Sequence, residues 1–231
     1  MTAAVSLRQP QARDVWLPTP SRADRDVPRA SKGHCIVHAV FGDGEGVRVQ
    51  AESLLEHKWQ LIVSARPETL ELREQVLFRW GDRPTDKHVF DMVVKERSGR
   101  RIAYTVKPEI RLRSGRFLAE IQEIAYWVKF KQFADDVRLL TDTDLDPVEL
   151  YNARVTAAVA KPDAEADSRA VALAATLTGA RSIRDLTQAL GMGERSYRAV
   201  LRLLRNHRLC TARTDRITPE TLVRRPEETR A

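Results

Sequence analysis

Cysteines are few in this sequence and long apolar runs are missing, and each shortage excludes a class of protein. Two cysteines, Cys35 and Cys210, stand far apart among 231 residues. They are too few for a disulfide framework, so a reducing, cytoplasmic compartment is expected. No run of about 18 apolar residues occurs, so no membrane span is predicted. A basic start followed by an apolar stretch is also missing, so no secretory signal is predicted.

The positive charge is concentrated at one end of the chain. The formal net charge is +7. The segment from Ser168 to Ala231 holds 13 arginines and 6 acidic residues, so it carries the whole excess and the remainder is neutral. A basic segment beside a neutral one indicates an acidic partner, most often nucleic acid. We therefore expect a DNA-associated protein of the cytoplasm or nucleoid.

Composition divides the chain into four parts. Residues 1–32 contain four prolines among charged and small residues, which predicts a flexible N-terminal arm. Residues 33–160 show the order helix, three strands, helix, strand, helix, which predicts an α/β sandwich. The polar stretch KPDAEADS at 161–168 predicts a linker. Residues 169–231 form the last, basic domain.

Two predicted strands bring a carboxylate and a lysine to one end of a sheet. In FDMVVKERSGRRIAYTVKPE the side chains of each strand alternate faces, so Asp91 can meet Thr105 and Lys107 of the next strand. On the helix expected before them, Glu52 falls in the apolar stripe and is predicted to be buried near Asp91. Carboxylates hold Mg²⁺ or Mn²⁺ for phosphodiester hydrolysis, and a nearby lysine orients water or offsets charge.

These stretches resemble a known family. ESLLEHKWQLIVSARPETLELREQVLFRW, HVFDMVV and RRIAYTVKPE are similar to motifs of the TnsA-like endonucleases of heteromeric cut-and-paste transposons, over roughly residues 50–140. The resemblance implies a restriction-endonuclease-like α/β sandwich followed by a winged helix-turn-helix domain. It also implies a DNA endonuclease that uses Mg²⁺ or Mn²⁺, with Glu52, Asp91 and Lys107 at the catalytic positions and Glu52 and Asp91 as metal ligands.

One departure from the family pattern weakens the metal site. Thr105 stands where the family has an acid or glutamine before Val-Lys-Pro, and a neutral hydroxyl binds Mg²⁺ poorly. A carboxylate could be supplied instead by Glu109, two residues past the lysine, or by Glu120 in the next helix. The alternative is a catalytically inactive relative that binds DNA as an architectural or regulatory factor, in which Asp91 and Lys107 form a partly buried ion pair.

The basic domain shows a helix, a Gly-Met-Gly turn and a longer helix, followed by two short strands, which predicts a winged helix. One side of the longer helix and the turn after it are rich in arginine. We predict DNA contacts there, by Arg195, Arg198, Arg202, Arg205, Arg213 and Arg216. A solvated face is the alternative. The resemblance also implies a transposase and an ATPase regulator as partners, and the sequence leaves open whether the chain forms a homodimer.

The run YWVKFKQF at 126–133 mixes aromatic and basic residues. Exposed aromatic rings with lysines could stack on bases or contact a partner. The favoured interpretation is a second packing face, against the C-terminal domain or the N-terminal strands.

Overall fold

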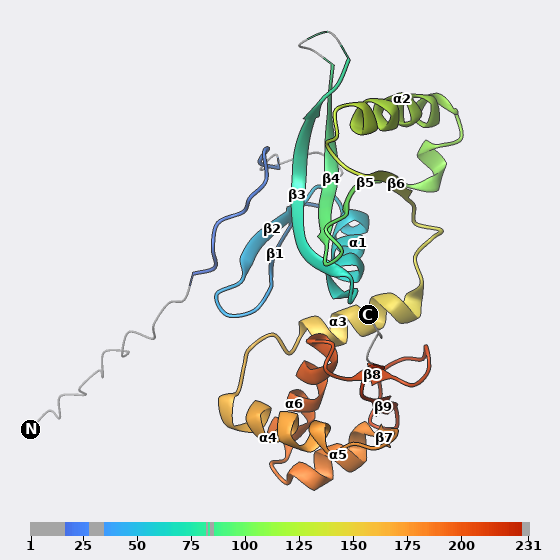
Figure 1. Cartoon of the computed structure of the whole chain (residues 1–231). Coiled ribbons are helices and arrows are strands. Elements are labelled where there is room, and N and C mark those ends of the chain that lie inside the picture. Colours follow the sequence, from blue (N-terminus) through green and yellow to red (C-terminus); the bar gives the residue numbers. More distant parts are fainter. Residues whose placement is uncertain (1–16, 28–34, 82, 84–85, 228–231) are drawn as a thin grey trace, which may run out of the picture.

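The computed structural model describes residues 17–27, 35–81, 83 and 86–227 (Figure 1). The protein is a mixed α/β protein, as predicted. Its larger, N-terminal part contains β1 (Val37–Phe41), β2 (Val47–Ala51), α1 (Leu54–Ala65), β3 (Thr69–Arg79), β4 (Lys87–Glu96), β5 (Arg101–Val106), the 3₁₀ helix η1 (Glu109–Arg111), α2 (Arg116–Phe130), β6 (Asp136–Leu140) and α3 (Pro147–Ala157). The C-terminal part contains α4 (Ala164–Ala175), β7 (Arg181–Ser182), α5 (Ile183–Leu190), α6 (Glu194–Arg205), β8 (Cys210–Thr211) and β9 (Leu222–Arg224).

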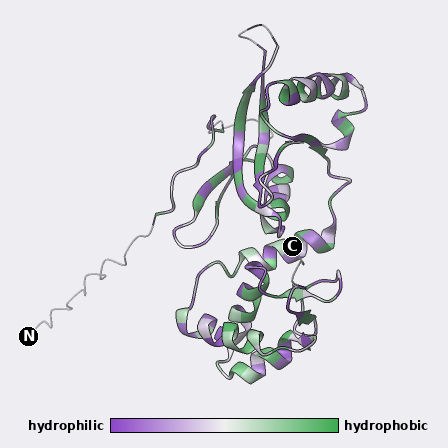
Figure 2. Ribbon diagram, in the orientation of Figure 1, coloured by the Kyte–Doolittle hydropathy of each residue, from purple (hydrophilic) through white to green (hydrophobic). Residues whose placement is uncertain are grey.

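A four-stranded sheet in the order β3-β4-β5-β6 forms the centre of the larger part. β3, β4 and β5 are antiparallel neighbours, and β6 pairs with β5 in parallel. A parallel neighbour requires a crossover connection, which α2 supplies. In Figure 2 the hydrophobic colour follows β4 and β5 in the middle of the sheet, whereas hydrophilic residues mark β3 at its edge.

The two faces of this sheet are covered by different helices. One cluster joins α1 to the sheet and includes Trp59, Ile62, Met92, Val94, Ile102 and Tyr104. The other joins α2 to the opposite face and includes Phe78, Phe90, Ala103, Ile121, Ile124 and Val128. The predicted inward stripe of the second helix is therefore confirmed for Ile121, Ile124 and Val128.

The C-terminal part has its own core. Three helices pack over a small three-stranded sheet in the order β7-β9-β8, with Ile183, Val200, Leu204 and Val223 among the buried residues. α3 belongs to both parts, because Ala153 packs in the α1 cluster while Val155 and the following Val159 pack in the C-terminal core. Figure 1 shows α3 running between the two parts.

Two predicted boundaries differ from the structure. α4 begins at Ala164 inside the expected linker 161–168, because Asp163 caps it by accepting a hydrogen bond from the backbone N–H of Ala166. The described part of the N-terminal arm, 17–27, is docked on the strands: Thr19 bridges Val47, and Val27 is buried. The remainder of the predicted arm, 1–16 and 28–32, lies outside the described residues. In the part of the chain that the structure describes, no helix is both long and apolar enough to cross a membrane.

Candidate active site

Glu56, rather than Glu52, is the buried acid at the start of α1. The helix begins at Leu54 with Ser53 as its N-cap. Ser53 accepts a hydrogen bond from the N–H of Glu56, and Oε2 of Glu56 accepts one at 2.8 Å from the N–H of Glu52, the residue before the cap. This arrangement is a variant of the capping box. Glu56 is 8% exposed. The predicted burial of Glu52 is wrong, because this residue precedes the helix and its side chain is 34% exposed.

Asp91 lies at a break in the alternation of β4. Phe90 packs under α2 and Met92 under α1, although a regular strand would place both on one face. The paired register of β4 and β5 ends at Met92 and Tyr104. Beyond it, Oδ2 of Asp91 accepts a hydrogen bond from the backbone N–H of Val106 at 2.7 Å. The carboxylate is thereby fixed in the sheet with 7% exposure.

Glu56 and Asp91 influence each other electrostatically. Burial, and after it the charge of Glu56, raises the pKa of Asp91 to about 7, whereas Lys107 and the Val106 N–H act in the opposite direction. The pKa of Glu56 is also raised, first by burial. Two buried carboxylates that resist ionising together create a region of negative potential that a cation would stabilise.

Gln75 of β3 is strained beside these acids. Glu74 pairs with Met92 and Val76 with Phe90, so Gln75 and Asp91 are the intervening residues of the two strands. Gln75 has a φ of 49° and is completely buried. This left-handed conformation is uncommon for a residue with a Cβ and clusters at functional sites. Its Nε2 lies 3.4 Å from Oε2 of Glu56, so the strained residue faces the buried carboxylates.

Lys107 completes the group of charged side chains. It follows directly after β5, and its ammonium lies 5.6 Å from the ring centroid of Phe117. A cavity of about 620 Å³ is lined by Glu52, Glu56 and Lys107 together. We call Glu52, Glu56, Gln75, Asp91 and Lys107 the acidic site. The structure thus brings together the three residues predicted to be catalytic, and it adds Glu56 and Gln75.

Thr105 does not face the acidic site. Its hydroxyl is completely buried and lies 2.9 Å from Nε2 of His88. The His88 ring packs edge-on against Phe90, which belongs to the cluster under α2. The predicted common face of Asp91 and Thr105 is wrong, because the irregularity in β4 turns Asp91 toward Glu56. Burial, followed by the charge of Lys107, lowers the pKa of His88 to about 4, so this imidazole is neutral.

Both proposed substitute carboxylates are exposed. β5 ends at Val106, and Glu109 begins η1 after Pro108, so Glu109 is not on the strand face predicted for it. Its backbone N–H donates to Oδ1 of Asp142, and its side chain is exposed. Glu120 lies on an exposed part of α2. Among the described residues, no group of three or more His, Cys, Asp or Glu side chains could hold a metal.

The acidic site nevertheless fits a hard divalent cation that keeps several waters. Mg²⁺ is usually bound by one or two carboxylates, with water or substrate oxygens filling the octahedron. Glu56 and Asp91 are two such carboxylates. One oxygen of Asp91, Oδ2, accepts a hydrogen bond from the Val106 N–H, which holds this carboxylate in position. Burial raises the pKa of both carboxyl groups, and a bound cation would favour their ionised forms.

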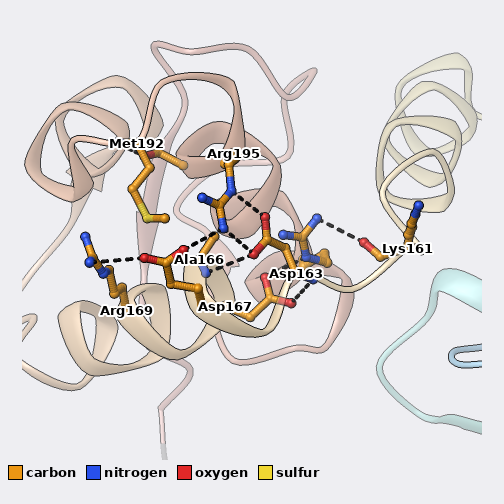
Figure 3. Close-up of polar contacts among 10 residues, drawn as sticks. Lys161, Asp163, Ala166, Asp167, Arg169, Met192 and Arg195 are labelled. Carbon is orange, nitrogen blue, oxygen red and sulfur yellow. Dashed lines mark hydrogen bonds and ion pairs between the residues drawn. The ribbon is translucent and has the colours of Figure 1, made fainter.

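The arginine stripe of α6 is largely occupied by partners in the same chain. Arg202 is 6% exposed, and its Nε lies 2.6 Å from Oδ1 of Asp167. Figure 3 shows Arg195 directed at Asp163, which it contacts through Nε at 2.7 Å and Nη2 at 2.8 Å. Nε of Arg205 lies 3.1 Å from Oδ1 of Asp43 in the β1–β2 turn. The stripe therefore fastens α6 to α4 and to the larger part.

The other predicted DNA contacts are more accessible. Arg198 is exposed and donates to the carbonyl of Ala158 at 3.3 Å. Arg213 and Arg216 are exposed in the segment between β8 and β9, and Arg216 stacks on Tyr151 with 5.3 Å to the ring centroid. These three side chains remain the accessible members of the predicted set.

The aromatic run of α2 is divided between packing and solvent. Trp127 and Phe133 are packing residues, but they pack in the cluster between α2 and the central sheet, and not in the predicted place against the C-terminal domain or the N-terminal strands. Tyr126 and Phe130 are 64% and 67% exposed and stack on each other. For these two rings the expected packing face is wrong, because they lie on the solvent side of α2.

No protein-family model matches the chain, and no curated protein matches it either. The family expectation therefore depends on the motifs and the geometry alone. Of the residues that the sequence argument missed, Glu56 had a signal: Ser53-x-x-Glu56 is the capping-box pattern. Gln75 had none, because a left-handed glutamine in a strand is visible only in the backbone.

Proposed function

We propose that this protein is a divalent-metal-dependent DNA endonuclease similar to the TnsA-like family, with a restriction-endonuclease-like domain and a C-terminal winged-helix-like domain. In this proposal Glu56 takes the helix position that the resemblance gives to Glu52. The observation that carries it is the convergence of two buried carboxylates, Glu56 and Asp91, with Lys107. Burial raises the pKa of both acids, and the charge of Glu56 raises that of Asp91 further, which disfavours folding unless the site uses them.

The residues have distinct roles. Glu56 and Asp91 would hold Mg²⁺ or Mn²⁺, and Gln75 holds Glu56 in place through its amide. The bound ion would polarise the scissile phosphate and activate water. Lys107 offsets negative charge on the phosphate and orients the attacking water. The Val106 N–H fixes the Asp91 carboxylate, so that its other oxygen is directed to one place.

The C-terminal part supports a DNA-binding role by its architecture and charge. Two helices joined by a Gly-Met-Gly turn and followed by a small sheet are typical of winged helices. Arg198, Arg213 and Arg216 are exposed there and are the side chains proposed to meet phosphates. A transposase and an ATPase regulator are the partners that the family resemblance suggests.

Calorimetric titration of Mn²⁺ tests the proposal. Wild type should bind Mn²⁺, Glu56→Gln and Asp91→Asn should lose the binding heat, and Glu120→Gln, on the exposed part of α2, should keep it as the matched control. Wild type should also nick supercoiled DNA in the presence of Mn²⁺ or Mg²⁺, and Asp91→Asn should not. If wild type gives neither binding heat nor nicking, the enzyme proposal is rejected.

The second candidate is an inactive relative that binds DNA as an architectural or regulatory factor. The position of Thr105 favours it, because this hydroxyl contacts His88 and contributes nothing to the acidic site. In that case Asp91→Asn leaves DNA binding unchanged and alters only stability. The metal titration and the nicking assay separate the two candidates.

A further inference from the structure

We infer that the turn between β5 and α2 is a phosphate-binding surface that guides a DNA strand into the acidic site. Its basic members are Arg111, Arg113 and Arg116, which we call the arginine turn. This inference depends on the proposed function for its substrate, a nucleic acid. In this inference the arginine turn, and not the arginine stripe of α6, binds the DNA backbone next to the acidic site.

The arginine turn has a net positive charge next to the acidic site. Between Lys107 and Arg116 the sequence KPEIRLRSGR contains four basic residues and one acid. Arg111 lines the same cavity as Glu56 and Lys107. A DNA strand whose phosphates lie on the arginine turn would therefore continue into that cavity, where Lys107 offers the next positive charge.

The arginines of the turn are free to accept an anion. Arg111, Arg113 and Arg116 are exposed, and none of them has an acidic partner within 4.0 Å among the described residues. In contrast, Arg195 and Arg202 of α6 already hold carboxylates. An arginine that is already paired must break that pair before it binds a phosphate, so the turn is the better site.

The backbone of the turn is held in a fixed shape. The N–H of Arg111 donates to Pro108, that of Leu112 to Glu109, and that of Gly115 to Leu112, at 2.8, 2.9 and 2.9 Å. Leu112 is buried and anchors the turn to the protein. Gly115 adopts a φ of 71°, which lets the chain enter α2. Side chains on a fixed backbone lose less conformational entropy on binding.

Phosphates of nucleic acid suit this surface better than an acidic peptide. A phosphodiester backbone presents regularly spaced single charges, and arginines bind phosphate oxygens through paired N–H groups. The cavity beside the turn contains carboxylates that would repel an acidic peptide but could share a cation with a phosphate. The acidic peptide is therefore kept as an outcome of the test.

Salt dependence of DNA binding by the full chain tests the inference. We compare wild type, Arg113→Gln/Arg116→Gln and the control pair Lys95→Gln/Arg100→Gln, which removes equal charge from exposed positions at the β4–β5 turn. Affinity for a short labelled duplex is measured in EDTA at several salt concentrations. Because each phosphate contact contributes about 0.9 to the log–log slope, the arginine pair should lower the slope by about 2 units and the control by none.

The outcomes are distinguishable. Equal slopes for the two pairs, or no DNA binding by wild type, overturn the inference. Poly-glutamate tests for an acidic protein partner. If wild type and the control pair bind it and the arginine-pair variant does not, the turn is a protein-binding surface and the inference is also overturned. Thermal unfolding checks that both pairs fold. If wild type takes up no Mn²⁺ but the slope falls as expected, the nuclease proposal fails while the phosphate surface stands. If wild type binds Mn²⁺ but the arginine pair and the control pair give equal slopes, the phosphate-binding inference fails and the nuclease proposal stands.

Discussion

The guanidinium of Arg25 lies 2.6 Å from Oε1 of Glu52, which ties the N-terminal segment to the acidic site. The same Nη2 atom lies 2.8 Å from Oε1 of Gln75. The segment is fastened on both sides of this contact, because Asp24 accepts from the N–H of Leu77 and Gln50 donates to the carbonyl of Arg25. A positive charge is therefore held at the rim of a site that we propose to bind a cation.

Replacing Arg25 should strengthen metal binding. Arg25→Gln removes one positive charge from the rim of the acidic site. This charge is partly exposed and paired with Glu52, so solvent screening limits its effect to about 1 kcal/mol, or roughly fivefold in the affinity for Mn²⁺. The matched control is Arg22→Gln. Arg22 lies on the same N-terminal segment as Arg25, but it pairs with Glu71 of β3 and not with a residue of the acidic site. Calorimetry should show tighter binding for Arg25→Gln alone. Weaker binding in Arg25→Gln would mean instead that Arg25 is needed to position Gln75.

Asp91→Asn should stabilise the protein at neutral pH. The pKa of Asp91 is about 7 in the folded chain against 3.8 for an exposed aspartate, so the folded state holds the proton more tightly. Stability from this group is present below pH 4 and is lost as the pH rises from about 4 to 7. The asparagine cannot ionise and avoids this loss. Its midpoint of thermal unfolding should exceed that of wild type at pH 8, with a difference that shrinks toward pH 4.

Glu52→Gln is the control for this effect. Its side chain is partly exposed and already paired with Arg25, so neutralising it should not raise the unfolding midpoint. A gain in Glu52→Gln equal to that in Asp91→Asn would show that the net charge of the site, rather than the burial of Asp91, limits stability.

The sequence predicted the fold more accurately than the site, and particular residues show why. The strand pattern around Phe90 and the stripe of Ile121, Ile124 and Val128 depend on local periodicity, which the chain carries in full. The site depends on departures from periodicity. In the structure Asp91 lies near Glu56 because β4 is irregular there. A prediction from regular alternation of faces places Asp91 beside Thr105 instead. Helical periodicity also selected Glu52, because the exact start of α1 is set by the Ser53 cap.

The role of the α6 arginines was the least accessible to sequence reasoning. A helical wheel shows which arginines share a side, but it does not show what lies opposite them. The acids that pair with Arg195 and Arg202 belong to the start of α4, which the sequence argument treated as a linker. Long-range ion pairs of this kind, such as the contact between Arg205 and Asp43, have no local signal.

Arg202→Ala should lower the free energy of unfolding of the C-terminal part. Any loss of DNA binding should follow from that lower stability rather than from a lost contact with DNA. Arg202 is buried, binds Asp167, and donates from Nη1 to the carbonyl of Lys161 at 3.2 Å. Truncating one member of a buried pair costs about 2–4 kcal/mol once the partial exposure of Asp167 is considered. Arg198→Ala, on the exposed side, should change stability by less than about 0.5 kcal/mol. Chemical denaturation of both variants measures the difference. Equal stabilities would mean that Arg202 is not a structural residue.

Thr105→Glu should leave metal affinity unchanged and should raise the pKa of His88. The wild-type hydroxyl contacts Nε2 of His88, whose pKa is about 4. A carboxylate placed there would be buried beside the imidazole and would favour its protonated form. In wild type, the depressed pKa makes stability fall as the pH drops from about 6.5 to 4, because the unfolded imidazole takes up the proton first. The new carboxylate should reduce or remove that loss, because it brings the folded pKa of His88 closer to the unfolded value.

Thr105→Gln is the isosteric control for this change, because it has the size of glutamate without the charge. Imidazole resonances followed by NMR should show a higher His88 pKa in Thr105→Glu than in Thr105→Gln, and Mn²⁺ calorimetry should give the same affinity for wild type and both variants. A tighter Mn²⁺ site in Thr105→Glu, with His88 unchanged, would place residue 105 among the metal ligands. The missing acid of the family motif would then be the single change that separates this site from a complete one.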